Sequence, residues 1–111
     1  MVYDALARYN ASKHNVIDIG GGYGLFAEEM LKLSNQPIAV IEPGPYLAKA
    51  CREKSLIVVE KFLEDVDASD LSSGPKAYTS FELFEHLHSP EMFLKHLCRM
   101  MASGDLFVFT T

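Results

Sequence analysis

Residues 15–24 read NVIDIGGGYG, a short apolar run that ends in a cluster of glycines. An apolar run of this length, bounded by glycine, is typical of a buried strand in a parallel sheet. Gly20, Gly22 and Gly24 form a G-x-G-x-G pattern directly after it. Glycines allow a tight turn with positive φ and let a ligand approach the backbone closely. The stretch therefore predicts a strand, a glycine loop and a helix whose first N–H groups are free for a polar ligand.

The rest of the chain continues this alternation of strand and helix. Further apolar runs predict strands over 38–41, 56–59, 77–81 and 106–109, and helical spacing predicts helices over 2–10, 24–33, 46–54 and 90–101. Residues 60–75 are acidic and contain Ser, Gly and Pro, which indicates a loop or one short helix. The alternation indicates an α/β fold, a parallel sheet with helices on both faces. A length of 111 residues suits a single domain over residues 1–111.

Composition excludes several classes of protein. A formal net charge of −5, without a cluster of Lys or Arg, argues against nucleic acid as a partner. No run approaches the ~20 apolar residues of a membrane span, and the mixed N-terminus with Asp4 is not a signal peptide. Cys51 and Cys98 lack metal-ligand spacing and are expected to be reduced core thiols. We therefore expect a cytoplasmic protein without membrane contact.

Two acids end neighbouring predicted strands, where ligands of open parallel sheets bind. Asp18 ends the first strand, and a buried carboxylate there needs a positive or hydrogen-bonding partner. Glu42 ends the second strand, where an acid can accept both hydroxyls of a ribose. The dinucleotide pattern G-x-G-x-x-G would need glycine at position 25, which is Leu25, and Asp18 would repel a pyrophosphate. The pattern favours a nucleoside ligand with a cationic amino-acid end.

These residues together resemble the class I S-adenosylmethionine-dependent methyltransferases. The family's acidic-x-G-x-G-x-G loop corresponds to Asp18–Gly24, its acid at the end of the second strand to Glu42, and its G-D-L-like run to Gly104–Leu106. The stretch TSFELFEHLHSP, residues 79–90, is similar to the E-x-x-E-H-x-x-x-P segment of the ubiquinone-biosynthesis-like branch. The resemblance covers residues 16–111 in the correct order.

The resemblance implies a Rossmann-like sheet of about five strands in the order 3-2-1-4-5. The final strands of the full methyltransferase fold are lacking and would follow residue 111. An exposed edge of the fifth strand would then invite pairing with another copy of the chain.

The resemblance also implies S-adenosylmethionine as cofactor and a small-molecule methyl acceptor. The glycine loop would approach the methionine part and the ribose, Asp18 would hold the amino-acid end, and Glu42 would bind the ribose hydroxyls. Pro43 and Phe62 would lie against the adenine, and the backbone of Leu63 would meet its edge. Near the methionine moiety and its methyl group would lie the residues that follow the fourth strand. The implied cofactor-binding residues are Asp18, Gly20, Gly21, Gly22, Gly24, Glu42, Pro43, Phe62, Leu63, Ser80, Phe81 and Glu82.

Glu82, Glu85 and His86 are spaced so that a helix would place them on one face. Three roles are open: ligands of a divalent metal, His86 as the catalytic base, or hydrogen bonds that hold this turn against the sheet. We expect a methyltransferase, with His86 as the candidate catalytic residue. The competing hypotheses are a non-catalytic or degenerate methyltransferase-like module that serves assembly, and an NAD-dependent oxidoreductase, which Leu25 and Asp18 disfavour.

Overall fold

The computed structural model describes residues 2–34 and 36–110. A parallel sheet forms its centre, with the strand order β3-β2-β1-β4-β5. The strands are β1 (Asn15–Ile19), β2 (Ile38–Ile41), β3 (Ile57–Val59), β4 (Lys76–Phe81) and β5 (Leu106–Thr110). The predicted Rossmann-like fold and its strand order are confirmed.

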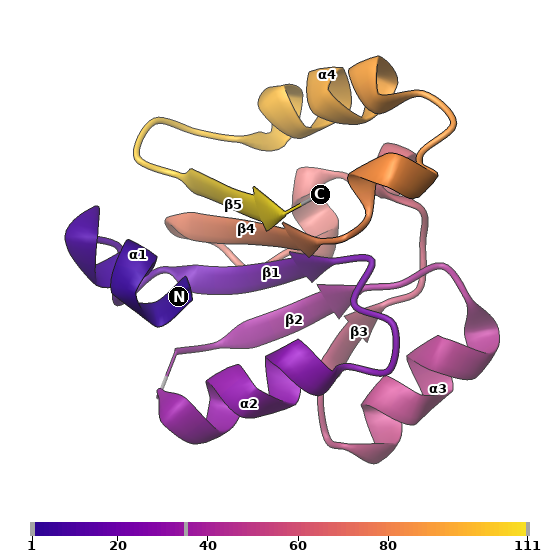
Figure 1. Ribbon diagram of the computed structural model, residues 1–111, viewed down its shortest axis with the longest axis horizontal. Helices are drawn as coiled ribbons and strands as arrows, with labels where there is room; N and C mark the ends of the chain where they lie inside the picture. The colour runs from indigo at the N-terminus through magenta and orange to yellow at the C-terminus, as the bar shows by residue number, and fades with distance from the viewer. Residues whose placement is uncertain (1, 35, 111) are drawn as a thin grey trace.

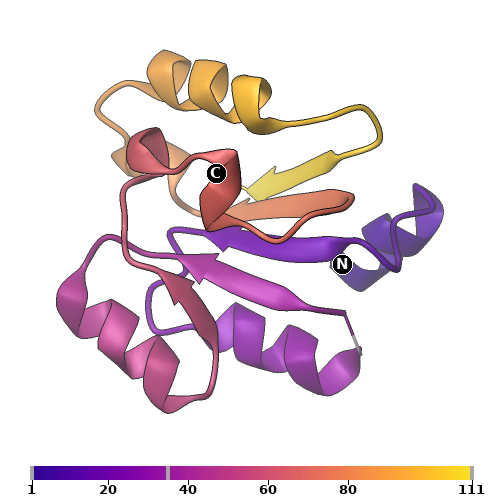
Figure 2. The ribbon, with the colours of Figure 1, turned by 180° about the vertical axis from the view of Figure 1, so that it is seen from behind.

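Helices cover both faces of the sheet. They are α1 (Val2–Arg8), α2 (Leu25–Leu33), α3 (Pro45–Glu53) and α4 (Pro90–Met100). Figure 1 shows α2 and α3 on one side of the sheet and α4 on the other, and Figure 2 shows the same layers from behind. Both α3 and α4 begin with a proline, which fits the first turn because no N–H is needed there.

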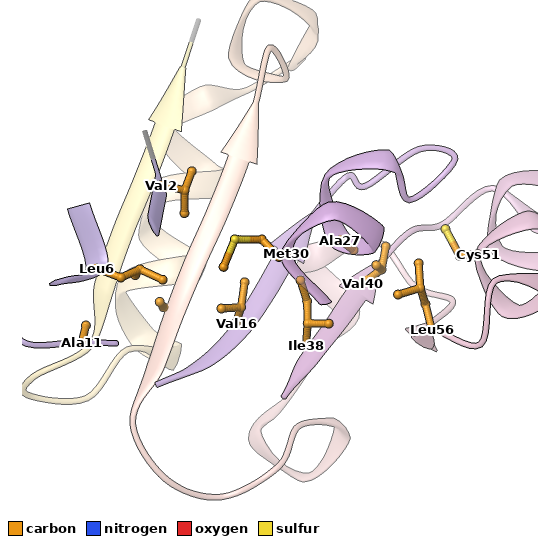
Figure 3. Packing of buried hydrophobic residues seen from close by; sticks show 11 residues of the cluster. Val2, Leu6, Ala11, Val16, Ala27, Met30, Ile38, Val40, Cys51 and Leu56 are labelled. Atoms are coloured by element: carbon orange, nitrogen blue, oxygen red, sulfur yellow. The ribbon is translucent and has the colours of Figure 1, made fainter. Parts of the chain in front are cut away.

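The core has two parts, one on each face of the sheet. The first lies under α1, α2 and α3 and, as Figure 3 shows, extends from Leu6 and Ala11 to Cys51 and Leu56. The second lies between the sheet and α4, and it is formed by Ile17, Ile19, Ile41, Leu63, Val66, Tyr78, Phe93 and Leu97. Burial on both faces explains why the strands are continuous apolar runs.

The acidic segment after β3 differs from the predicted loop or single helix. It forms two short 3-10 helices, η1 (Leu63–Asp65) and η2 (Ala68–Asp70). The Asp67 side chain accepts from the Ser69 N–H at 2.9 Å, and the Asp70 side chain accepts from the Asp67 N–H at 3.0 Å. These aspartate side chains accept from backbone N–H groups that a longer helix would use. The segment therefore forms two short turns instead of one helix.

The two cysteines differ. Cys51 is buried as expected, whereas Cys98 is exposed, so the prediction of a second core thiol is wrong. Helix α4 buries Phe93 and Leu97, which are one turn apart. Cys98 follows Leu97 and is rotated by about 100° around the helix axis, away from the core.

At the edges of the described sheet lie β3 and β5. Self-association through β5 stays a prediction. Within residues 2–34 and 36–110, no helix has the length and apolar character needed to cross a membrane.

Candidate functional site

The predicted site residues gather at the carboxyl ends of the strands. The strand order reverses at β1, which has β2 on one side and β4 on the other, and Asp18 pairs in register with Val40 and Thr79. The segments that follow β1, β2 and β4 therefore share the carboxyl edge of the sheet. In open parallel sheets this is the point at which ligands bind.

The glycine loop, defined as Gly20–Gly24, turns the chain from β1 into α2. Gly22 and Gly24 have φ values of 58° and 79°, in the left-handed region that favours glycine. At Gly24 an added Cβ would lie 2.6 Å from Cδ1 of Leu56, so packing also requires glycine. At Gly22 no atom lies within 4 Å of an added Cβ, so this part of the backbone faces open space that a ligand can approach.

Glu42 joins the glycine loop to the loop after β2. Its side chain is only 6% exposed. Oε1 accepts from the Gly22 N–H at 2.9 Å, and Oε2 accepts from the Gly44 N–H at 2.9 Å. The carboxylate is thus oriented by the backbone, and each oxygen keeps a further lone pair for another donor.

Asp18 lies beneath the glycine loop and is 3% exposed. The sequence predicts either a positive or a hydrogen-bonding partner for this carboxylate. The structure shows a hydrogen-bonding partner, since the Thr79 hydroxyl donates to Oδ1 at 2.8 Å. Burial raises the pKa of Asp18 to about 7; the bond from Thr79 opposes this increase and the charge of Glu42 adds to it. The charge of Asp18 therefore changes near neutral pH.

A cavity of about 530 Å³ adjoins the loop at Gly20. This volume suits a small-molecule ligand, and most of the lining is apolar. Its walls come from the ends of β1 and β2, from η1, from the segment that holds the short turn η3 (Phe84–His86), and from α4. The lining residues are Ile19, Gly20, Ile41, Pro43, Phe62, Leu63, Glu64, Leu83, His86, Leu87, His88, Ser89, Met92 and Phe93.

Five of the predicted site residues line this cavity: Gly20, Pro43, Phe62, Leu63 and His86. The others belong to the glycine loop, to its supports or to the end of β4. Sequence analysis did not assign Leu83, Leu87 or Met92 to a site. Their only signal was apolar spacing, which by itself predicts packing against the core.

Ser80 and Phe81 point to opposite faces of the sheet, as neighbours on a strand must. The Phe81 ring packs edge-on against Phe26 of α2, with ring centroids 4.7 Å apart. Ser80 is fully buried, and its Oγ has no hydrogen-bond partner among the described residues. Ser80 therefore carries a buried polar atom without a partner at the end of β4.

Glu82, Glu85 and His86 do not share a helix face, so the geometry on which the metal hypothesis depended is wrong. Glu82 has a φ of 53°, and only Phe84–His86 forms a helical turn. The described part of the chain holds no group of three His, Cys, Asp or Glu side chains that could bind a metal ion. The left-handed backbone of Glu82 lies between β4 and the turn Phe84–His86, so Glu82 does not share the turn with the other two residues.

Among residues 2–34 and 36–110, no hydrogen bond from these side chains holds the turn against the sheet either. Its bonds are between backbone groups, from the His86 N–H to the Leu83 carbonyl at 2.9 Å and from the Leu87 N–H to the Phe84 carbonyl at 3.2 Å. The His86 side chain is 75% exposed and lies 3.9 Å from a carboxylate oxygen of Glu85. His86 thus stands at the rim of the cavity, accessible from solvent.

Comparison with known proteins gives a consistent result. A family model described as a methyltransferase domain matches residues 2–111. A relative named ubiquinone biosynthesis O-methyltransferase, from Xanthomonas oryzae pv. oryzae, is 27% identical over 110 residues, which is 95% of this chain and 46% of the relative. The chain thus spans about half the length of the curated relatives it matches.

Solved methyltransferase structures share the fold. A sugar N-methyltransferase from Streptoalloteichus sp ATCC 53650 superposes with a TM-score of 0.78 at 15% identity, over 97% of this chain and 44% of that protein. A magnesium protoporphyrin IX methyltransferase from Synechocystis PCC 6803 with bound SAM gives 0.68 at 13% identity, over 90% and 51%. At these identities the likeness supports the fold alone.

Proposed function

This chain belongs to the methyltransferase-domain family, and on that premise we propose that its glycine-loop site binds S-adenosylmethionine for methyl transfer to a small-molecule acceptor. One observation carries the proposal. The backbone at Gly22 faces open space, and its N–H is held by the buried carboxylate of Glu42, beside an apolar cavity. A nucleoside, with a flat aromatic base for the cavity and sugar hydroxyls for the carboxylate, matches this combination.

The residues present fit such a ligand. Glu42 would accept from the ribose hydroxyls through its remaining lone pairs. Pro43, Phe62 and Leu63 would enclose the adenine in the cavity that they line. Asp18, below the loop, would favour the cationic amino-acid end. Ser80 has a buried hydroxyl without a partner, which is costly and favours a polar ligand atom nearby.

S-adenosylmethionine, when bound, supplies a methyl group that its sulfonium makes electrophilic. The residues of the site then have two tasks, to orient the reactants and to remove a proton from an oxygen acceptor. We propose His86 as the general base, because its exposed side chain at the rim of the cavity is accessible to an acceptor. Glu82, directly after β4, would lie near the methionine moiety and its methyl group.

An enzyme is favoured over a non-catalytic module by the family match and by the name of the Xanthomonas relative. The acceptor and the reaction of the whole protein are proposals, since the chain corresponds to 46% of that relative.

Isothermal titration with S-adenosylhomocysteine tests cofactor binding without requiring an acceptor. We expect saturable heat with a micromolar Kd, and no heat with NADH as the matched control. If millimolar S-adenosylhomocysteine gave no heat, or if NADH bound more tightly, the proposal would be wrong.

A further inference from the structure

The contacts around the glycine loop assign a positioning role to a second element, α3. On the basis of the proposed function, we propose that Cys51 and Lys54 fix the conformation of the glycine loop and thereby set the affinity for S-adenosylmethionine. Neither residue needs to touch the ligand. Both act through the backbone carbonyl groups of Gly22 and Tyr23.

Gly22 is held from two sides. Its N–H donates to Glu42, and its carbonyl accepts from the Cys51 thiol, with an Sγ–O distance of 3.2 Å. Burial raises the pKa of Cys51, so the group remains a thiol and keeps its proton for this bond. Figure 3 shows Cys51 at the end of the buried cluster, near Leu56 and Val40. Packing in this cluster thus fixes the position of the thiol that donates to the loop.

Tyr23 is also held from two sides. Its carbonyl accepts from the Lys54 ammonium at 2.9 Å. Its ring meets the ring of Tyr46 edge-on, with centroids 6.4 Å apart. Tyr46 lies in the first turn of α3 and Lys54 directly follows the last, so the two contacts come from opposite ends of one helix.

Gly24 completes the contact with α3. An added Cβ would lie 3.0 Å from Sγ of Cys51 and 2.6 Å from Leu56. Three consecutive loop residues, Gly22 to Gly24, therefore rest on α3 or on the residues that follow it.

These contacts matter because the loop contains four glycines in five residues. Glycine loses more conformational freedom on ordering than any other residue. If the ligand had to order the loop, that cost would weaken binding. A loop that is already ordered by α3 binds more tightly, although the ligand contacts are the same.

Lys54→Met tests the proposal with little risk to folding, since Lys54 lies at the surface end of α3. We expect the Kd for S-adenosylhomocysteine to rise about threefold to tenfold, as for one lost hydrogen bond. Lys54→Arg retains a donor and should restore the Kd to within about twofold of the wild type. Lys49→Met is the matched control, because Lys49 is on the same helix and its ammonium pairs with Glu53, at 3.9 Å. It should bind like the wild type.

Cys51→Ala and Cys51→Ser form a second pair. Both remove the sulfur, but only serine keeps a donor, so Cys51→Ala should bind more weakly than Cys51→Ser. The free energies of unfolding from urea titrations separate this difference from a general loss of stability.

Amide hydrogen exchange of the ligand-free protein gives a readout that is independent of the ligand. We expect the Gly22, Tyr23 and Gly24 amides to exchange faster in Lys54→Met and Cys51→Ala than in the wild type and in Lys49→Met. Unchanged exchange and unchanged Kd in both variants would overturn the proposal. If the wild type did not bind S-adenosylhomocysteine, the proposed function would fail and with it the link to affinity, while the exchange rates would still decide whether α3 orders the loop.

Discussion

The glycine loop and the segment 82–89 follow neighbouring strands of the sheet, β1 and β4, but they are held in different ways. The glycine loop is fixed by side chains from other elements: Glu42, Cys51 and Lys54 each bond its backbone. The segment 82–89 is held by its own backbone bonds, by bonds from the Glu82 N–H to Thr110, and by the Phe84 ring, which packs against Phe93 and Phe109. The comparison indicates that the glycine loop, the proposed cofactor site, is held by side-chain bonds from other elements, whereas the segment with the proposed base His86 is held by backbone bonds and by packing of Phe84.

The largest effect should come from the buried carboxyl group beneath the glycine loop. The pKa of Asp18 is about 7 in the folded protein, against the ordinary value of 3.8 for an aspartate side chain. Because the folded state holds the proton more tightly, the wild type should lose stability as the pH rises from about 4 to about 7, by up to about 4 kcal/mol.

Asp18→Asn cannot titrate and is the matched control. Urea titrations at several pH values give the difference in unfolding free energy between the two proteins. This difference should change between about pH 4 and about pH 7 and stay constant outside that range. A difference that does not change with pH would contradict the assignment.

The next effect concerns packing of the loop on α3. Gly24→Ala meets both a φ of 79° and the close approach of Leu56, and should cost about 3 kcal/mol of unfolding free energy. Gly104→Ala separates the two causes, because Gly104 has a φ of 92° but no atom within 4 Å of an added Cβ. It should cost about 1 kcal/mol. Equal losses in chemical denaturation would mean that the close approach of Leu56 adds nothing.

Glu42→Gln should weaken S-adenosylhomocysteine binding about 10-fold to 100-fold. The amide loses one acceptor, so it cannot hold both Gly22 and Gly44 and also accept from a ribose. Glu85→Gln makes the same change in the segment 82–89 and should alter the Kd by less than about twofold. Comparable losses in the two variants, measured by calorimetry, would remove the distinction between the two regions.

The smallest effect on affinity is expected for His86→Gln. The His86 side chain is 75% exposed at the rim of the cavity, so the Kd should stay within about twofold of the wild type. Methyl transfer to an oxygen acceptor should nevertheless fall about 100-fold or more if His86 is the base. A large loss of affinity with normal turnover would instead place His86 among the cofactor-binding residues.

The two regions also differ in how far the sequence predicts them. The glycine loop and its acids were predictable because each depends on a local pattern: glycine at fixed spacing, and an acid at the end of an apolar strand. The strand order followed from the alternation of strands and helices together with the family resemblance.

The features of the site that the sequence does not predict depend on single dihedral angles and on long-range contacts. The spacing of Glu82, Glu85 and His86 suggested one helix face, but the left-handed φ of Glu82 interrupts it, and no neighbouring glycine signals this. The bonds from Cys51 and Lys54 to the loop join residues about 30 positions apart and leave no pattern in the sequence. For this reason the sequence predicts Cys51 only as a core thiol.

A nitrogen-15 NMR titration with S-adenosylhomocysteine tests most directly whether the glycine loop and the adjoining cavity form one cofactor site. We expect the largest shift changes at the amides of Gly20–Gly24, Gly44, Phe62 and Leu63, with smaller changes at Glu85 and none at Gly104. The largest changes at the segment 82–89, or no change at the glycine loop, would contradict the account.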